Sequence, residues 1–162
     1  MASIMPPIPR FFFLYIEPSL CFFGGAFQPV LNPHSITTLL PAPLAGRHTT
    51  DPNPTPLETM LALQSATLMF MIAMVTVIVM VFAKDRAVVR GYVVASAVTD
   101  LPHWASFAYV LGWEGLRQWR TWEAPLWMQL LVPVFTLMFK LGYLSGAFGE
   151  DRVPEKKGRK EL

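Results

Sequence analysis

GYVVASAVTDLPHWASFAYVLG (residues 91–112) is a run long enough to cross a bilayer, and it carries Asp100, Pro102 and His103 near its middle. A helix of about 20 apolar residues spans the hydrocarbon core of a membrane. A carboxyl group and an imidazole at the centre of such a run are costly to bury, so they need either a structural partner or a chemical task. The rest of the chain indicates which partners are available.

The composition places the whole chain in a membrane setting. Of its 162 residues, 53% are hydrophobic and only 15% are charged. The apolar residues gather in four runs, at residues 11–30, 57–83, 91–112 and 125–148. These runs predict one all-α domain over residues 1–148, a four-helix transmembrane bundle with the lipid bilayer as its surroundings. The net charge of +2 gives no indication of nucleic acid, and we expect none as a partner.

The segments between the runs have distinct compositions. Residues 31–56 contain six prolines, which exclude a long helix and predict a Pro-rich loop between the first two helices. Residues 113–124 contain three tryptophans, which is typical of a membrane interface. Residues 149–162 are highly charged and predict a mobile tail. The first run follows Arg10 as in a signal peptide, but Glu17-Pro18 interrupts it and no small-residue cleavage site follows, so we expect a retained helix.

The basic residues predict the orientation. With four spans, nine of the 13 lysines and arginines fall at the N-terminus, in the 84–90 connector and in the tail, and only three fall on the opposite side. Because cytosolic loops are enriched in basic residues, both termini are predicted to be cytosolic and the Pro-rich loop lumenal. Arg159-Lys160 then has the form of a retrieval signal of the endoplasmic reticulum, although a solvated basic tail explains these residues equally well.

Three charged side chains lie at similar predicted depths in three different helices. At roughly 1.5 Å per helical residue, Glu17 lies about 9 Å from the cytosolic end of its helix, Lys140 about 10 Å and Asp100 about 13 Å. His103 lies one turn deeper than Asp100 on the same helix face, because residues i and i+3 are neighbours. The sequence predicts these depths, whereas the rotation of the side chains toward one another is an assumption.

Two interpretations of these residues remain open. In the structural one, Lys140 pairs with Asp100 or Glu17 and the pair fastens the bundle, as intramembrane charges usually do. In the functional one, two carboxyls share one ammonium in a low dielectric, so that pairing keeps one charged and desolvation keeps the other neutral. Such a set provides a general acid and a general base. His103 would then relay a proton or activate a water, and proline kinks beside the acids would widen a cavity.

Other residues are predicted to contact a substrate, to pack helices or to be solvated. Side chains predicted to contact a substrate are Tyr15, Gln64, Trp104 and Tyr143. Gly142-x-x-x-Gly146 is expected to permit close helix approach. His34 and His48 lie in a polar loop without metal-ligand spacing, so we expect them to be solvated. We find no Cys/His metal cluster, no phosphate-binding loop and no Gly-x-Ser-x-Gly elbow, and we therefore expect neither a metal nor an organic cofactor.

Three stretches carry a resemblance to a known family. They are PPIPRFFFLYIEP (residues 6–18), TDLPHW (residues 99–104) and FKLGYLSGAFG (residues 139–149). Together with the tryptophan-rich loop, they resemble small fungal four-span membrane proteins classed as a domain of unknown function. The resemblance covers most of the chain outside the Pro-rich loop.

The resemblance implies an enzymatic role. Some members resembling this group are described as membrane epoxide hydrolases of fungal polyketide pathways, and the layout more distantly resembles emopamil-binding-like (EXPERA) sterol isomerases and small meroterpenoid cyclases. It implies Glu17 and Asp100 as an acid–base pair whose ionisation Lys140 sets. The family pattern leads us to expect Arg at the position of Lys140. Lys differs from that expectation, because its ammonium is a point charge and does not form the bidentate clamp of a guanidinium.

These observations lead to one functional expectation and one alternative. We expect an endoplasmic-reticulum membrane enzyme of fungal secondary metabolism that opens an epoxide, by hydrolysis or cyclisation, on a lipophilic polyketide or terpenoid. The alternative is a non-catalytic membrane protein that binds a lipid or a partner and uses the buried charges for helix packing. The sequence leaves the oligomeric state open.

Overall fold

The computed structural model describes residues 4–41 and 44–151, and within these ranges the chain is helical and contains no strand. The predicted all-α class is therefore confirmed. Most of the predicted mobile tail, from residue 152 onward, lies outside the described residues. Three helical segments are long and apolar enough to cross a membrane, namely Pro7–Leu31, Pro56–Phe82 and Ala124–Leu144. These three fit an integral membrane protein, and they correspond to three of the four predicted spans.

The first of these segments changes its hydrogen-bonding pattern along its length. It consists of α1 (Pro7–Phe11), the π-helical η1 (Phe12–Ile16), α2 (Glu17–Ser19), the π-helical η2 (Leu20–Phe27) and α3 (Gln28–Leu31). Pro18 and Pro29 lack the backbone N–H that an α-helix requires, and the ladder shifts to wider turns around Pro18. The 3-10 segments η3 (Pro33–Leu39) and η5 (Gly46–Thr49) follow in the Pro-rich loop.

The remaining helices begin and end at recognisable signals. Thr55 and Glu58 form a capping box at the start of α4 (Pro56–Phe82), and Asp85 caps α5 (Arg86–Arg117). The helix axis of α5 is interrupted at Gly112, whose φ is 58°. The short η6 (Trp119–Thr121) then leads to α6 (Ala124–Leu144).

The helix α6 ends four residues earlier than predicted, because Gly146 adopts a left-handed conformation with φ 81°. The N–H of Ala147 bonds the carbonyl of Gly142 at 3.0 Å, and the N–H of Gly146 bonds that of Tyr143 at 3.1 Å, which is a Schellman motif. A Cβ on Gly142 would meet Phe148 of the following segment at 2.7 Å. The prediction that Gly142 and Gly146 form a helix–helix contact is therefore wrong: they close a helix end.

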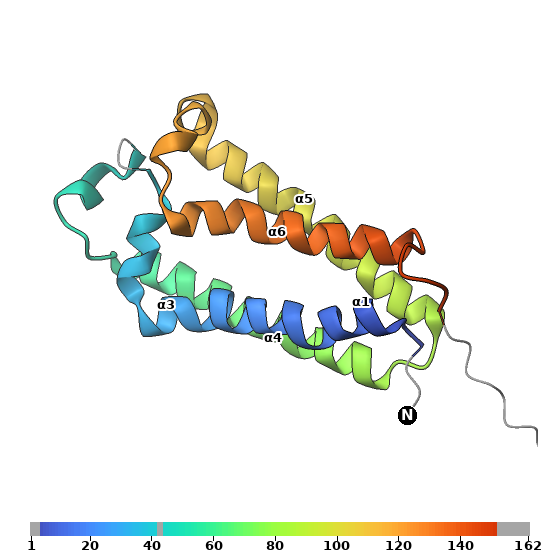
Figure 1. Cartoon of the computed structure of the whole chain (residues 1–162). Coiled ribbons are helices and arrows are strands. Elements are labelled where there is room, and N and C mark those ends of the chain that lie inside the picture. Colours follow the sequence, from blue (N-terminus) through green and yellow to red (C-terminus); the bar gives the residue numbers. More distant parts are fainter. Residues whose placement is uncertain (1–3, 42–43, 152–162) are drawn as a thin grey trace, which may run out of the picture.

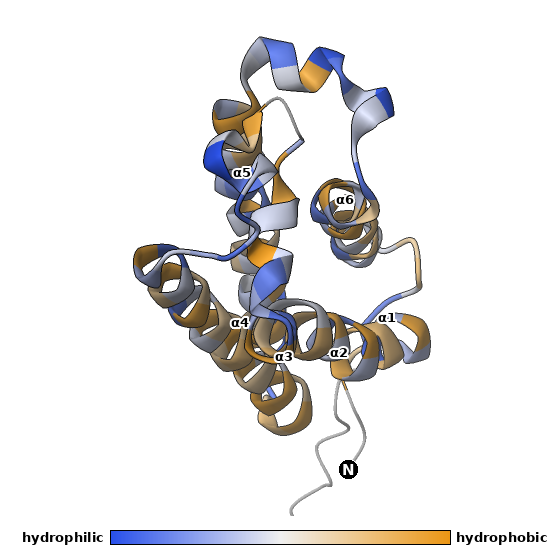
Figure 2. Cartoon of the chain, turned by 90° about the vertical axis from the view of Figure 1, so that its left-hand side faces the viewer, coloured by the Kyte–Doolittle hydropathy of each residue, from blue (hydrophilic) through white to orange (hydrophobic). Residues whose placement is uncertain are grey.

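The helices form two layers (Figure 1). The first helical segment packs on α4 in one layer, and α5 packs on α6 in the other. Viewed end-on, the helices are largely hydrophobic, whereas hydrophilic residues gather in the connecting segments (Figure 2). A Cβ on Gly25 would meet Met69 at 2.7 Å, so this glycine permits the close approach of η2 to α4.

Aromatic side chains close the end of the bundle where both described termini lie. Phe12 of the first segment stacks on Phe139 of α6 with ring centroids 4.1 Å apart, and Phe13 meets Tyr143 edge-on at 6.2 Å. At the opposite end, Trp122 packs with Leu111 and Leu126 and donates its indole N–H to the carbonyl of Gly115 at 2.9 Å. Two separate apolar cores thus hold the two ends of the bundle.

A histidine fastens the loop to the start of α4. His48 is only 11% exposed, so the prediction that it is solvated is wrong. Its Nε2 lies 2.8 Å from Oε1 of Glu58 and its Nδ1 lies 3.0 Å from the carbonyl of Asp51. The Asp51 carbonyl can only accept, and the Glu58 carboxylate accepts as well, so the two contacts favour the imidazolium, in which both ring nitrogens donate. The hydrogen bond to Glu58 raises the pKa of His48.

This contact predicts a pH-dependent stability. Because the folded pKa of His48 lies above its ordinary value of 6.5, the stabilisation is fully present below that pH and is lost as the pH rises through the raised pKa. We expect the melting temperature of the detergent-solubilised protein to fall across this window, and to fall less in His48→Gln. The exposed His34→Gln is the control and should melt like the wild type. An identical pH dependence in His48→Gln would contradict the assignment.

Candidate functional site

The ammonium of Lys140 is the centre of the candidate site. Its Nζ lies 3.0 Å from Oδ2 and 3.3 Å from Oδ1 of Asp100. It also lies 3.3 Å from Oε1 of Glu17 and 3.3 Å from the backbone carbonyl of Ser96. The structure thus brings together the three charged residues that the sequence placed at one depth, and they come from α6, α5 and α2.

The cluster is removed from water. The side chain of Lys140 is 3% exposed, that of Glu17 is 8% exposed and that of Asp100 is 13% exposed. Charges at such burial persist only when they are paired. Here two carboxyls face one ammonium, so the pairing is unequal: both oxygens of Asp100 accept from Lys140, but only Oε1 of Glu17 contacts it. Oε2 of Glu17 has no hydrogen-bond partner among the described residues.

The backbone departs from α-helical geometry on both sides of Glu17, the acidic residue of the first helical segment. Glu17 lies between the π-helical segments η1 and η2, and its N–H bonds the carbonyl of Phe12 five residues earlier. Pro18 follows directly and offers no N–H. Single π-helical turns frequently mark functional positions in helices. The wider turn sets the direction in which the Glu17 side chain leaves the helix.

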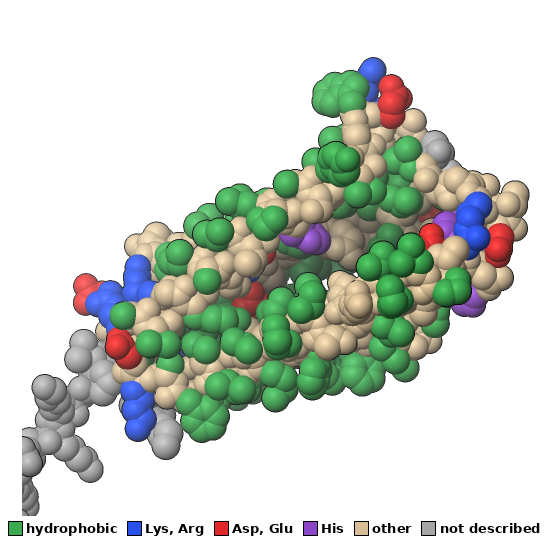
Figure 3. Space-filling model, turned by 180° about the vertical axis from the view of Figure 1, so that it is seen from behind, with side chains coloured by type: hydrophobic (Ala, Val, Ile, Leu, Met, Phe, Trp, Pro, Cys, Tyr) green, Lys and Arg blue, Asp and Glu red, His purple; other side chains and the backbone are tan. Residues whose placement is uncertain are grey.

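His103 belongs to the same region but has a different partner. Its Nε2 lies 2.9 Å from the backbone carbonyl of Gln129 in α6. The ring is half-buried and lies one turn along α5 from Asp100. On the back of the molecule, a hollow runs between the two helix layers, with a histidine and an acidic side chain at its margin (Figure 3).

The four predicted substrate contacts are dispersed. Tyr15 is 56% exposed and packs on Phe11, so it lies on the outer surface. Tyr143 is fully buried in the aromatic end, beneath the guanidinium of Arg90. Trp104 is half-buried, and its indole N–H has no hydrogen-bond partner among the described residues. Gln64 is exposed and retains polar groups that a ligand is able to reach, whereas the indole N–H of Trp104 is buried.

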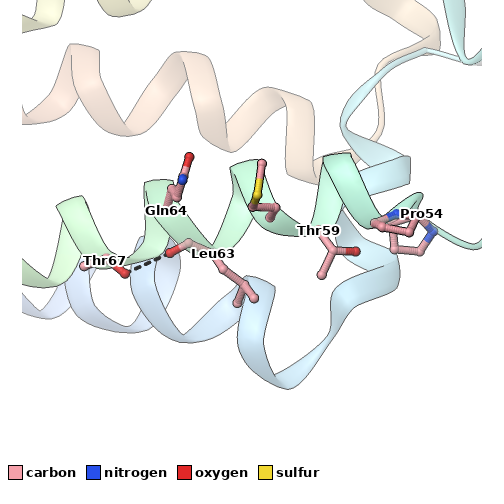
Figure 4. Close-up of a pocket in the computed structure, with 7 residues that line it drawn as sticks. Pro54, Thr59, Leu63, Gln64 and Thr67 are labelled. Carbon is pink, nitrogen blue, oxygen red and sulfur yellow. Dashed lines mark hydrogen bonds between the residues drawn. The ribbon is translucent and has the colours of Figure 1, made fainter.

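Gln64 lines a pocket of about 600 Å³ at the first turns of α4 (Figure 4). The other lining residues are Pro54, Pro56, Thr59, Met60, Leu63 and Thr67. Gln64 projects from α4 on the side that faces α6, away from Leu63 (Figure 4). A second, apolar groove of about 450 Å³ lies between the first helical segment and α6, where Ile16 and Phe139 line it immediately before Glu17 and Lys140 in the sequence. Within residues 4–41 and 44–151, no three His, Cys, Asp or Glu side chains are grouped closely enough to hold a metal ion.

Comparison with known proteins places the chain in a family. Residues 2–150 match the family model described as "Domain of unknown function (DUF7704)". The chain belongs to the DUF7704 family. No curated protein and no solved structure matches it. Any functional assignment for this DUF7704 chain therefore starts from the chemistry of the buried cluster.

Sequence reasoning missed several residues of this DUF7704 site. The backbone carbonyl of Ser96 accepts from Lys140, and no sequence pattern marks such a carbonyl. Thr136 is buried one turn before Lys140 and donates to the carbonyl of Pro133 at 3.1 Å. Pro133 itself was a usable signal, because a proline inside an apolar helix releases a carbonyl four residues earlier.

The unequal pairing predicts a large cost for removing the ammonium. Lys140→Met leaves two buried carboxyls without a counter-charge, and we expect it to lower the free energy of unfolding by about 3–5 kcal/mol. Adding Glu17→Gln and Asp100→Asn to the same chain should recover much of this loss. Lys84→Met, in the exposed connector before α5, is the control and should be nearly neutral. Reversible unfolding in detergent measures all three, and a Lys140→Met protein as stable as Lys84→Met would contradict the pairing.

Proposed function

We propose that this protein is a membrane-embedded enzyme that opens an epoxide on a lipophilic substrate by acid–base catalysis. The observation that supports it best is the contact of one buried ammonium with two carboxyls, one of which keeps an oxygen free. Lys140 lies within 3.3 Å of both Glu17 and Asp100, while Oε2 of Glu17 has no hydrogen-bond partner among the described residues. A buried carboxyl oxygen without a hydrogen-bond partner is costly, and in this proposal a substrate atom supplies the missing partner.

Charge balance assigns the proton. A buried cluster of two carboxylates and one ammonium carries a net negative charge, which is costly in a low dielectric. One proton on a carboxyl makes the cluster neutral. Asp100 receives two contacts from Lys140 and Glu17 receives one, so Asp100 is the carboxylate and Glu17 is the carboxylic acid. The proton of Glu17 then resides on Oε2, the buried oxygen that has no hydrogen-bond partner among the described residues.

The reaction uses these groups in turn. Glu17 donates its proton to the epoxide oxygen as the C–O bond breaks, which removes the need to expel an alkoxide. A water, or a hydroxyl of the substrate itself, attacks the carbon and gives its proton to the base, formed by His103 together with the Asp100 carboxylate. Water yields a diol and an internal hydroxyl yields a cyclic ether. The proton taken from the nucleophile returns to Glu17, so the set is restored without any other reagent.

The membrane arrangement belongs to the same proposal. Residues 91–112 of α5 form a further spanning helix, the third in chain order, and pairing with Lys140 offsets the cost of Asp100 within it. Both termini are cytosolic, the Pro-rich loop is lumenal and the membrane is that of the endoplasmic reticulum. Arg86 and Arg90 pair with Asp151 at 2.8 and 3.8 Å, which gathers basic residues at the end where both described termini lie. By its resemblance to fungal membrane epoxide hydrolases, the substrate is a polyketide or terpenoid of secondary metabolism.

A second candidate function is non-catalytic. In it, the protein binds a lipid or a partner protein, and the cluster only fastens the bundle. The observation in its favour is that Lys140 joins α2, α5 and α6 and finds acceptors in all of its contacts. In this case the position of each charge within the pair is unimportant as long as the pair persists.

Two substitutions test the catalytic proposal. Glu17→Gln removes the acid and Asp100→Asn removes the carboxylate, and each is expected to lower turnover of a lipophilic epoxide in detergent micelles by about 10²–10⁴-fold. Glu114→Gln, on an exposed carboxyl beyond the Gly112 interruption of α5, is the control and should retain full turnover. A folded Glu17→Gln protein with wild-type turnover would overturn the proposal.

A charge swap separates the two candidate functions. The double variant Asp100→Lys/Lys140→Asp keeps an opposite pair between α5 and α6. If the cluster only stabilises the bundle, the swap restores both the stability and the cellular function that Asp100→Lys or Lys140→Asp alone would lose. If it catalyses, the swap restores stability alone.

A further inference from the structure

The orientation of the His103 ring depends on a carbonyl that a proline leaves free. In an α-helix, the carbonyl of residue i accepts from the N–H of residue i+4. For Gln129 that residue is Pro133, which lies inside α6 and has no N–H. The Gln129 carbonyl therefore lacks its i+4 partner, and it is 2.9 Å from Nε2 of His103 in α5.

This hydrogen bond determines the tautomer of the imidazole. A backbone carbonyl only accepts, so Nε2 of His103 carries the hydrogen. A neutral imidazole has one N–H and one lone pair, which places the lone pair of His103 on Nδ1. The two ring nitrogens thus have separate roles: Nε2 holds the ring against α6, and Nδ1 is able to accept a proton.

We propose that Pro133 is a positioning residue, which fixes His103 as the Nε2–H tautomer so that Nδ1 is the atom that takes the proton from the attacking hydroxyl. This inference rests on the proposed function and assigns its base to one atom. Asp100 is less available for that task, because both of its oxygens already accept from Lys140 at 3.0 and 3.3 Å.

The proton can be followed through the step. As the oxygen of the nucleophile bonds to carbon, its O–H bond breaks and the proton moves to Nδ1 of His103. The imidazolium so formed keeps Nε2–H on the Gln129 carbonyl, and Asp100 lies one turn away on the same helix face. Loss of that proton to the Glu17 carboxylate after product formation returns both groups to their starting states.

Pro133→Ala tests the positioning role. Alanine supplies an N–H that joins Gln129 to the helix ladder and competes with His103 for that carbonyl. Because proline is about 3 kcal/mol less favourable than alanine inside a helix, the variant is expected to fold at least as well as the wild type. The matched control is Pro125→Ala, since Pro125 lies in the first turn of α6, where an N–H has no partner within the helix.

Two measurements are made on the full chain in detergent. The first is the ¹⁵N NMR spectrum of the labelled imidazoles, with the His103 signals assigned by their loss in His103→Gln. Wild type and Pro125→Ala should show a single Nε2–H tautomer, and Pro133→Ala a mixture of tautomers. The second is turnover of a lipophilic epoxide, for which Pro133→Ala should lose about 10-fold or more in kcat with little change in KM.

The outcomes separate this inference from the proposed function. An unchanged His103 spectrum in Pro133→Ala overturns the positioning role. A changed spectrum with unchanged turnover, in an enzyme that Glu17→Gln inactivates, overturns the base role of His103 and leaves the proposed function standing. Absence of epoxide turnover in the wild type overturns the proposed function and the base role together, while the spectrum still decides the positioning role of Pro133.

Discussion

The structure depends on the burial of one ammonium group against two carboxyls in a low dielectric. Lys140 of α6 contacts Asp100 of α5 and Glu17 of the first helical segment within 3.3 Å, so a single side chain connects both helix layers. An unpaired charge at this depth is expensive, and each partner therefore constrains the other two. The excess carboxyl is the feature that distinguishes this cluster from a simple ion pair.

The two ends of the bundle give the cluster its setting. Aromatic rings from the first helical segment and α6 close one end, with Phe12 stacked on Phe139. At the other end, Trp122 anchors the α5–α6 connection through the carbonyl of Gly115. The charged and polar groups lie between these two apolar cores, together with a backbone carbonyl that Pro133 releases. In the proposed function, this polar centre between two packed ends receives the lipophilic substrate.

The sequence predicted the helical class and the common depth of Glu17, Asp100 and Lys140, because apolar run length and the rise of a helix are nearly invariant. Their mutual facing was not predictable, since it depends on π-helical turns around Glu17 that no periodicity reveals. The end of α6 was misplaced because Gly146 caps the helix instead of packing it. The burial of His48 was not predicted, because its partner Glu58 belongs to the following helix. The exposure of Tyr15 was not predicted either, because it depends on the π-helical turns that rotate the first helical segment.

We predict that one of the two carboxyls at Lys140 is protonated in the folded protein at neutral pH. Infrared spectroscopy measures this directly, because the C=O stretch of a protonated carboxyl is separate from that of a carboxylate. We predict one such band in the wild type. It should be absent in Glu17→Gln, which removes the acid, and also in Asp100→Asn, where Glu17 becomes the only partner of the ammonium and ionises. A wild-type spectrum without the band, or a band unchanged in Glu17→Gln, would contradict the account.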